Sequence, residues 1–176
     1  AHNQRWLLAL DLPTRLPPEG SLAPTLEALS NVPVRVRSRF TFASSPDYHA
    51  NRQEAPATLA EALRLPPGIN PRSRALARQW RSLPPGRIVE AALAMFRQGE
   101  FQYTLQPPLL GHDAVDQFLF ETRRGFCEHY ASAFVFLMRA ADVPARVVAG
   151  YQGGEVNPVD DYLIVRQSDA HAWAEV

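Results

Sequence analysis

The sequence of 176 residues has no lysine, one cysteine and two methionines. All 18 basic residues are therefore arginines, and 18 acidic residues balance them to a formal net charge of zero. A neutral chain with no basic helix and no basic run interleaved with aromatic residues is a poor candidate for nucleic-acid binding. A single cysteine excludes an internal disulfide, so cysteine usage does not indicate the redox compartment.

Long apolar runs are also absent. The longest uncharged apolar run, Ala133 to Met138, is much shorter than the roughly 20 residues that span a bilayer. No signal-like segment is seen at Ala1, so we expect the chain to be soluble. Because it has no initiator Met and stops at Val176 within an apolar alternation, we also expect it to be a piece of a longer protein.

The first and last parts of the chain differ in proline content and in charge. Fourteen of the sixteen prolines precede residue 109, which predicts a loop-rich first part and a compact last part. Residues 1–110 contain 13 arginines and 8 acidic residues, whereas residues 111–176 contain 5 arginines and 10 acidic residues. The acidic last part would mildly favour cationic partners such as amines.

Two runs in the first part are typical of β-strands, Trp6–Leu10 and Val32–Phe42. The second run alternates apolar residues with Arg35, Arg37 and Arg39. The arginine face could bind an anionic polymer, but a solvated outer face of a sheet is the simpler interpretation. We predict that residues 1–50 form part of a β-rich domain and that residues 51–57 form a linker.

The remaining residues, 58–176, are predicted to form the core domain. Asn70-Pro71 is typical of a helix start, because asparagine is a favourable N-cap and proline suits the first helical position. Residues 84–86, Pro-Pro-Gly, would end this helix and lead into a second one. Residues 101–105 are predicted to be extended.

The most apolar helical segment begins at the cysteine. Apolar residues follow the spacing of a helix face at Phe126, Tyr130, Ala133, Phe134, Leu137, Met138 and Ala141. Gly125 lets the chain turn sharply into this helix, and Cys127 occupies its amino end. The free amides and the dipole of a helix amino terminus favour a thiolate, which is the nucleophilic form of cysteine.

Three β-rich runs follow. Residues 147–151 and 162–165 are predicted to be neighbouring strands. The last run, residues 170–176, alternates strictly and places His171, Trp173 and Glu175 on one face. Small residues on its other face would permit close packing against the cysteine helix, which would bring His171 beside Cys127.

A cysteine nucleophile needs a base, and a third group that fixes the base's tautomer. Cys127 and His171 provide the first two in the order found in papain-like enzymes. The alternative is structural, because a lone cysteine is often a small buried hydrophobic residue.

Three ordered blocks carry a resemblance to a known family. They are GFCEHYASA at 125–133, RAADVPARVVAGY at 139–151 and DAHAWAEV at 169–176. Together they resemble the core of bacterial transglutaminase-like domains, including periplasmic domains of membrane-anchored proteins. The resemblance implies an α+β, papain-like core with the nucleophile at a helix amino terminus packed on an antiparallel sheet. It also implies that the core is truncated before its last strands.

The resemblance also implies a reaction. Cys127 would attack a glutamine carboxamide of a protein or peptide, His171 would protonate the departing ammonia, and an amine such as lysine, or water, would resolve the thioester. The family's third catalytic residue is an Asp on a strand beyond Val176. Tyr103 or Trp80 could donate to the oxyanion, Glu128 and His129 suit capping or groove roles, and no cofactor is expected.

Two alternatives remain open at this stage. The same pair could hydrolyse peptide or amide bonds, and the groove could bind peptides without catalysis. Metal sites are less well supported, because Cys127-x-His129 lacks the spacing of a structural zinc site and Asp160-Asp161 lacks a calcium-loop pattern. We therefore expect no metal.

Overall fold

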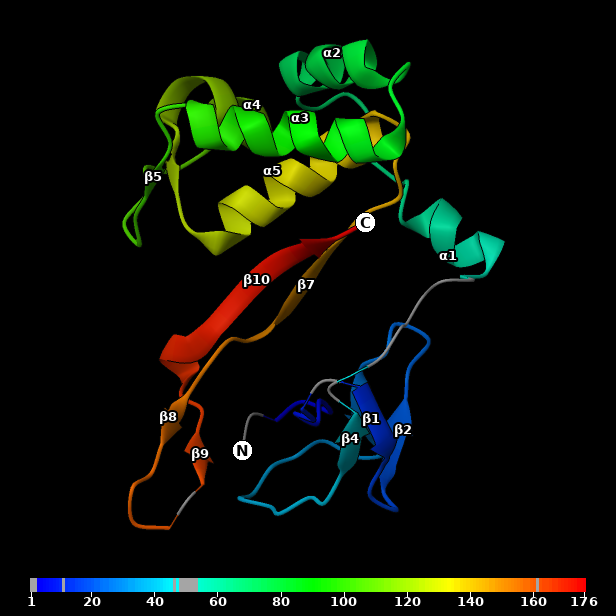
Figure 1. Cartoon of the computed structure of the whole chain (residues 1–176), viewed down its shortest axis with the longest axis vertical. Helices are drawn as coiled ribbons and strands as arrows, with labels where there is room; N and C mark the ends of the chain where they lie inside the picture. Colours follow the sequence, from blue (N-terminus) through cyan, green and yellow to red (C-terminus); the bar gives the residue numbers. More distant parts are fainter. Residues whose placement is uncertain (1–2, 11, 46, 48–53, 161) are drawn as a thin grey trace. The chain divides into compact units, whose positions relative to one another are not determined.

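The computed structural model describes residues 3–10, 12–45, 47, 54–160 and 162–176 (Figure 1). The chain separates into two compact units, Ala1–Gln53 and Glu54–Val176, called unit 1 and unit 2 below. The predicted linker over residues 51–57 lies partly outside the described residues, and helix α1 begins within it at Pro56.

Unit 1 contains short strands. Antiparallel pairing joins β1 (Leu12–Arg15) to β4 (Ala43–Ser45) and β2 (Gly20–Leu22) to β3 (Ala28–Ser30). Leu7 is buried, and its amide donates to the carbonyl of Ala28 at 2.8 Å. The β-rich character of this part agrees with the prediction, although the strands lie elsewhere.

Neither predicted strand of unit 1 forms. In the run Trp6–Leu10, only Trp6 makes a β-bridge, to Leu29, and the run Val32–Phe42 contains no strand. Val34 exchanges hydrogen bonds with residues 3 and 4, but Pro33 has no amide to extend that pairing. Alternation indicates which face of a strand each side chain occupies. A strand also requires a neighbouring strand that pairs with it residue by residue, and the described part of unit 1 provides none along residues 32–42.

Unit 2 holds the helices. These are α1 (Pro56–Glu61), α2 (Pro71–Trp80), α3 (Pro85–Gln98), α4 (Ala114–Gln117), the π-helical turn η1 (Phe118–Thr122), α5 (Cys127–Ala140) and the short 3-10 turn η2 (Gln167–Asp169). The predicted helix starts at Asn70-Pro71 and after Pro84 are confirmed, because proline lacks the amide that the first turn would leave unpaired. The predicted extended segment is confirmed as β5 (Gln102–Tyr103), which pairs in parallel with β6 (Arg124–Gly125).

Helix α5 lies at the centre of unit 2. In Figure 1, α2 and α3 cover one side of α5, and strands β10 (Ala170–Glu175) and β7 (Arg146–Tyr151) lie on the other. Leu137 and Met138 of α5 are 0 % exposed, and α2, α3 and β10 pack against this helix. The prediction of an apolar core helix that begins at the cysteine is confirmed.

The strand pairing differs in one respect from the prediction. β7 pairs antiparallel with β10, and His171 stands opposite Gly150. The run at residues 162–165 forms β9 (Leu163–Ile164), which pairs with β8 (Glu155–Val156) and not with β7. Gly153 and Gly154 have positive φ angles, and they turn the chain into this separate hairpin before it returns as β10.

Helices α2 and α4 cap each other. The Asn70 side chain does not cap its own helix, and its Oδ1 accepts from the amides of Val115 and Asp116 at 3.0 and 3.2 Å. In return, the carboxylate of Asp116 accepts from the amides of Arg72 and Ser73 at 2.8 and 2.7 Å and from the Ser73 hydroxyl. This arrangement fixes α4 and η1, which lead directly into the segment before Cys127.

Candidate active site

Cys127 is the first residue of α5, and its free thiol is half-buried. The residue two positions before it, Gly125, is required by close packing. A Cβ at this position would lie 2.6 Å from Cβ of His129 and 2.9 Å from a ring carbon of Phe118. The sharp turn that the sequence predicted at Gly125 therefore also allows the His129 ring to lie against the chain.

His129 caps the helix that Cys127 begins. Its Nδ1 accepts from the amide of Phe126 at 3.4 Å, and its ring packs against Phe126 and Phe118 with centroid distances of 4.6 and 5.6 Å. A ring nitrogen that accepts a hydrogen bond carries no proton. The capping role expected for His129 is confirmed. Its ring caps the start of α5 and packs against Phe118 and Phe126.

Tyr103 lies beside the segment that enters α5. In the parallel pairing of β5 and β6, Tyr103 stands opposite Gly125, and the amide of Thr104 donates to the Gly125 carbonyl at 2.8 Å. The ring stacks on Tyr130 at 6.2 Å and is 59 % exposed. The structure thus brings the predicted donor Tyr103 to the neighbourhood of Cys127.

Tyr130, one helical turn after Cys127, was predicted only as part of the apolar helix face. Burial raises the pKa of Tyr130 above its ordinary value of 10, and Tyr103 contributes to the shift. The Tyr130 hydroxyl is therefore protonated at neutral pH and can donate a hydrogen bond. The stacking that joins the two tyrosines could not be read from the sequence, because β5 and α5 are far apart in the chain.

His171 lies near the start of β10 and is half-buried. Ala172, on the opposite face of the strand, is buried, and Ala174 packs against the helical core. The predicted packing of the alanine face on the cysteine helix is confirmed, since β10 contacts α5. In Figure 1, α5 and β10 run in the same direction and begin at the same end of unit 2. Cys127 is the first residue of α5, and His171 is the second residue of β10.

Trp173 shares the face of His171. A Cβ at Gly150, which stands opposite His171, would lie 2.8 Å from Cη2 of Trp173. Glycine at position 150 therefore makes room for the indole ring. The ring remains partly exposed. Alternation predicted the face of Trp173 but not this cross-strand contact with Gly150.

The two carboxylates nearest to His171 in the sequence have other partners. Asp169 accepts from the amide of Arg166 at 2.7 Å, and Glu175 accepts from the Arg146 guanidinium at 2.8 Å. Arg146 also pairs with Glu54 at 3.2 Å. An Asp that orients His171 therefore stays a prediction for residues that follow Val176.

The structure does not bring Trp80 to Cys127. Trp80 ends α2, and the next residue, Arg81, donates to the carbonyl of Ala140 at the carboxyl end of α5 at 3.0 Å. Because α5 has 14 residues, its two ends are about 20 Å apart at about 1.5 Å per residue. Trp80 packs against the core of unit 2, which the apolar spacing of its helix had already indicated.

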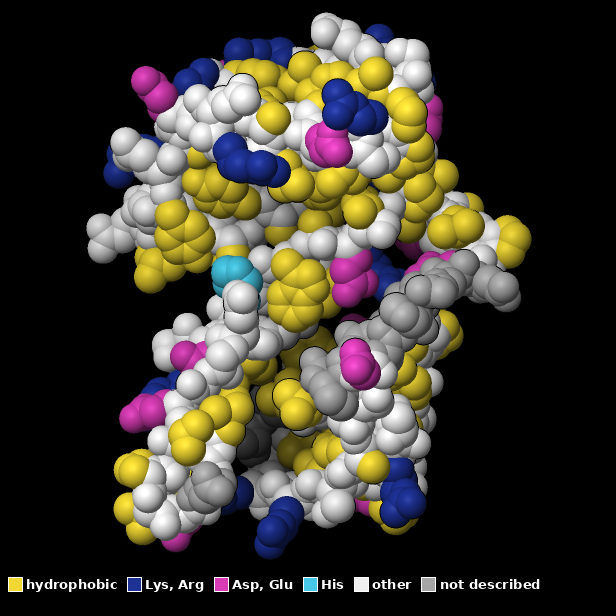
Figure 2. Space-filling model, viewed as in Figure 1, with side chains coloured by type: hydrophobic (Ala, Val, Ile, Leu, Met, Phe, Trp, Pro, Cys, Tyr) yellow, Lys and Arg dark blue, Asp and Glu magenta, His cyan; other side chains and the backbone are white. Residues whose placement is uncertain are grey.

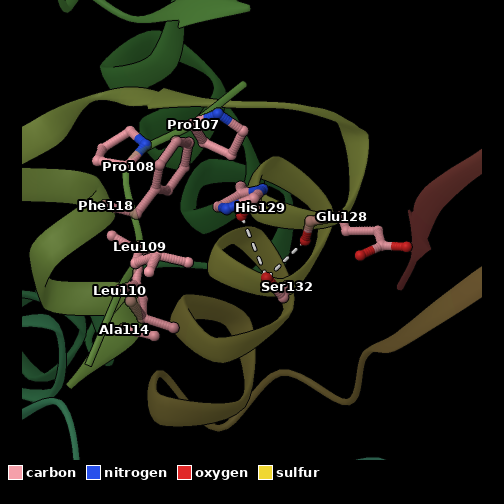
Figure 3. Close-up of a pocket in the computed structure, with 10 residues that line it drawn as sticks. Pro107, Pro108, Leu109, Leu110, Ala114, Phe118, Glu128, His129 and Ser132 are labelled. Carbon is pink, nitrogen blue, oxygen red and sulfur yellow. Dashed lines mark hydrogen bonds between the residues drawn. The ribbon is translucent and has the colours of Figure 1, made fainter. Parts of the chain in front are cut away.

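Glu128 is exposed in the first turn of α5, on the rim of a pocket of about 400 Å³. Figure 3 shows proline, leucine and phenylalanine side chains on one side of this turn and the Glu128 carboxylate directed away from them. The Ser132 hydroxyl donates to the carbonyls of Glu128 and His129 at 2.6 and 3.2 Å. Glu128 thus lines a pocket, and its groove role stays a prediction.

The described residues hold no group of three His, Cys, Asp or Glu side chains that converge as metal ligands. Asp161, His2 and His49 lie outside the described residues. In Figure 2, arginine and acidic side chains are interspersed over the helical layer of unit 2 and do not form a broad basic surface on the face shown. No helix in the described part of the chain is long and apolar enough to cross a membrane.

Comparison with known proteins supplies the family. Residues 74–176 match the Transglutaminase-like superfamily. The protein-glutamine gamma-glutamyltransferase of Pseudomonas aeruginosa is 46 % identical over 175 residues, which cover 98 % of this chain and 26 % of that protein. The uncharacterized protein YebA of Bacillus subtilis is 45 % identical over 73 residues, which cover 39 % of this chain and 10 % of YebA.

Solved structures support the same family assignment. The crystal structure of the periplasmic domain of TgpA from Pseudomonas aeruginosa superimposes with a TM-score of 0.93 and 45 % identity, covering 98 % of this chain and 61 % of that one. A crystal structure of the same domain bound to ethylmercury gives the same TM-score and identity and is covered to 63 %. The chain thus spans about a quarter of the full-length relative and under two thirds of its periplasmic domain.

Proposed function

Because the chain belongs to the transglutaminase-like superfamily, we propose that it contributes the nucleophile and the base of an enzyme that transfers the acyl group of glutamine side chains. The observation that carries this proposal is the packing of β10, which bears His171, on α5, which begins at Cys127. A helix amino terminus beside a histidine strand suits a thiolate nucleophile.

In the proposed reaction, the sulfur of Cys127 attacks the carboxamide carbon of a glutamine and forms a tetrahedral intermediate. His171 donates its proton to the amide nitrogen, the C–N bond breaks, and ammonia leaves a thioester on Cys127. A primary amine then attacks the thioester carbon while neutral His171 takes its proton, and the C–S bond breaks to regenerate the thiolate and the imidazolium. Water in place of the amine gives glutamate.

The oxyanion of the intermediate needs donors that are fixed in advance. We assign this role to the backbone amide of Cys127 and, of the two side chains considered, to Tyr103. Its pairing opposite Gly125 and its exposed ring support this choice, whereas the location of Trp80 near the far end of α5 does not.

The substrates would be proteins or peptides that carry glutamine, with an amine donor such as lysine. Since the chain has no lysine, this segment cannot supply the amine itself. We place the reaction in the periplasm, as a domain of a membrane-anchored protein that needs no cofactor and binds no nucleic acid. The likeness to a periplasmic domain supports this location.

A second reaction, hydrolysis of peptide or amide bonds, uses the same Cys127 and His171. The support for it is chemical, because water can resolve the thioester whenever no amine is bound. A third possibility, peptide binding without catalysis, would leave the thiol without a function.

The test is ammonia release from a glutamine peptide, with and without a primary amine. The protein used should match the full length of the TgpA periplasmic domain, with Cys127→Ala as its control. We expect cysteine-dependent ammonia together with incorporation of the amine. Ammonia without incorporation would support hydrolysis instead, and the absence of both products would reject the proposed reaction.

Alkylation of the thiol distinguishes an enzyme from a binding module. The chain has a single cysteine, so labelling reports Cys127 alone. If His171 and the helix terminus favour the thiolate, iodoacetamide should react at mildly acidic pH about ten-fold faster than with the His171→Ala variant. Equal rates in the two proteins would argue against an ion pair between Cys127 and His171.

A further inference from the structure

We propose that the pocket beside the first turn of α5 receives an apolar side chain of the polypeptide whose glutamine is modified. The inference rests on the proposed function and adds a specificity site to it. It assigns a role to the loop of residues 105–111, which the reaction itself does not use.

The pocket lies beside the first turns of the helix that Cys127 begins. Three of its lining residues, Glu128, His129 and Ser132, belong to these turns of α5. An extended polypeptide advances about 3.3–3.6 Å per residue, so a chain with its glutamine at Cys127 reaches the pocket within a few residues. The volume of about 400 Å³ is within the usual range for ligand pockets and exceeds what one leucine side chain needs.

The pocket walls are apolar. They are formed by Pro107, Pro108, Leu109, Leu110, Ala114, Val115 and Phe118. Figure 3 shows the proline pair, Phe118 and the leucines around the His129 ring. Leu109 is fully exposed at the pocket, so its side chain is accessible to a bound segment.

The loop that forms one wall is held at both ends. Before the prolines, the Thr104 amide donates to the Gly125 carbonyl at 2.8 Å, and after the leucines, the Gly111 amide donates to Gln117 at 2.6 Å. The two prolines fix their own φ angles. Because little of this wall must become ordered on binding, contact with an apolar side chain is not offset by a large entropic cost.

Charge limits what can occupy the site. Glu128 is the carboxylate in the lining, and it makes no ion pair within the described part of the chain. Its carboxylate points away from the apolar wall. An aspartate in the occupying segment would be repelled, whereas a leucine or phenylalanine would fill the pocket.

The experiment compares glutamine peptides that differ at one flanking position, which carries leucine, serine or aspartate. Ammonia release gives kcat/KM for each peptide, and the position is scanned on both sides of the glutamine. At one position we expect leucine to exceed serine by about ten-fold, the lower end of what one apolar contact gives, and aspartate to be poorest. Leu109→Ser should reduce the preference for leucine several-fold, and Glu128→Gln should specifically improve the aspartate peptide.

Leu105→Ser is the matched control, because Leu105 is an exposed leucine of the same loop and does not line the pocket. This variant should keep the full preference. An active enzyme with no preference at any position, or a preference that survives Leu109→Ser, would overturn the inference.

Failure of the proposed reaction would be visible separately. Binding of the same peptides to the Cys127→Ala variant, followed by fluorescence anisotropy, does not require turnover. A leucine preference in binding without ammonia release would reject the reaction and support the pocket. Equal binding of the three peptides would overturn the pocket, whatever the reaction.

Discussion

Units 1 and 2 organise their apolar residues in different ways. In unit 1, Leu7 and Ala28 are buried, while Trp6, Leu8, Leu10 and Val36 are largely exposed. In unit 2, helix α5 buries most of its residues between other helices and a strand. A helix satisfies its own backbone hydrogen bonds and needs partners only for packing, whereas a strand needs a neighbour for both.

The largest expected effect in unit 2 concerns catalysis. His171→Ala should reduce amine incorporation by about 10²- to 10⁴-fold, the usual contribution of a general acid–base group. His112→Ala is the control, because His112 is exposed and pairs only with Asp113. The measurement is kcat/KM with circular dichroism to verify folding, and a loss no larger than in the control would exclude His171 as the base.

The difference in core packing between the two units can be measured by replacing one buried leucine in each unit with alanine. Leu137→Ala should lower the free energy of unfolding by about 4 kcal/mol and Leu7→Ala by about 2 kcal/mol, because a thin core collapses around a cavity more easily. Denaturant unfolding, followed by the helical signal, reports unit 2, and amide hydrogen exchange reports unit 1. Equal losses would mean that unit 1 is as tightly packed as unit 2.

A third effect tests the reciprocal capping of α2 and α4. Asp116 is 3 % exposed, and Asp116→Ala would leave the amide of Arg72 and the buried amide of Ser73 without this acceptor. The expected loss is about 1–3 kcal/mol of unfolding free energy. Glu90→Ala, which removes an exposed acid paired only with Arg87, should cost far less in the same denaturation assay. Similar losses would show that the capping contributes little.

The smallest effect is expected in unit 1. Arg37 is exposed, and Arg37→Gln should change the unfolding free energy by less than about 0.5 kcal/mol, as is usual for surface positions. Amine incorporation should also be unchanged. A strong effect on either quantity would show that the arginine series binds a partner and is not merely a solvated face.

The main helices of unit 2 and the strand that carries His171 were predictable for the same reason. Apolar spacing, prolines at helix starts and the alternation around His171 are local patterns, and each remains correct in the structure. The strands of unit 1 and the partner of β9 were not predictable. Pairing joins residues that are distant in sequence, and neither alternation nor proximity in the chain specifies which edges meet.

The amino-acid sequence by itself determined that Cys127 begins an apolar helix and that His171 lies on a strand with one small-residue face. These features follow from side-chain period and from the conformations that glycine and proline favour or forbid. Only the tertiary structure decided that Tyr103 lies beside the segment that enters α5, that Trp80 belongs near its other end, and that an apolar pocket adjoins the first turns of α5. Such relations depend on how separate elements pack, and packing is set by the complementarity of whole surfaces that no local pattern records.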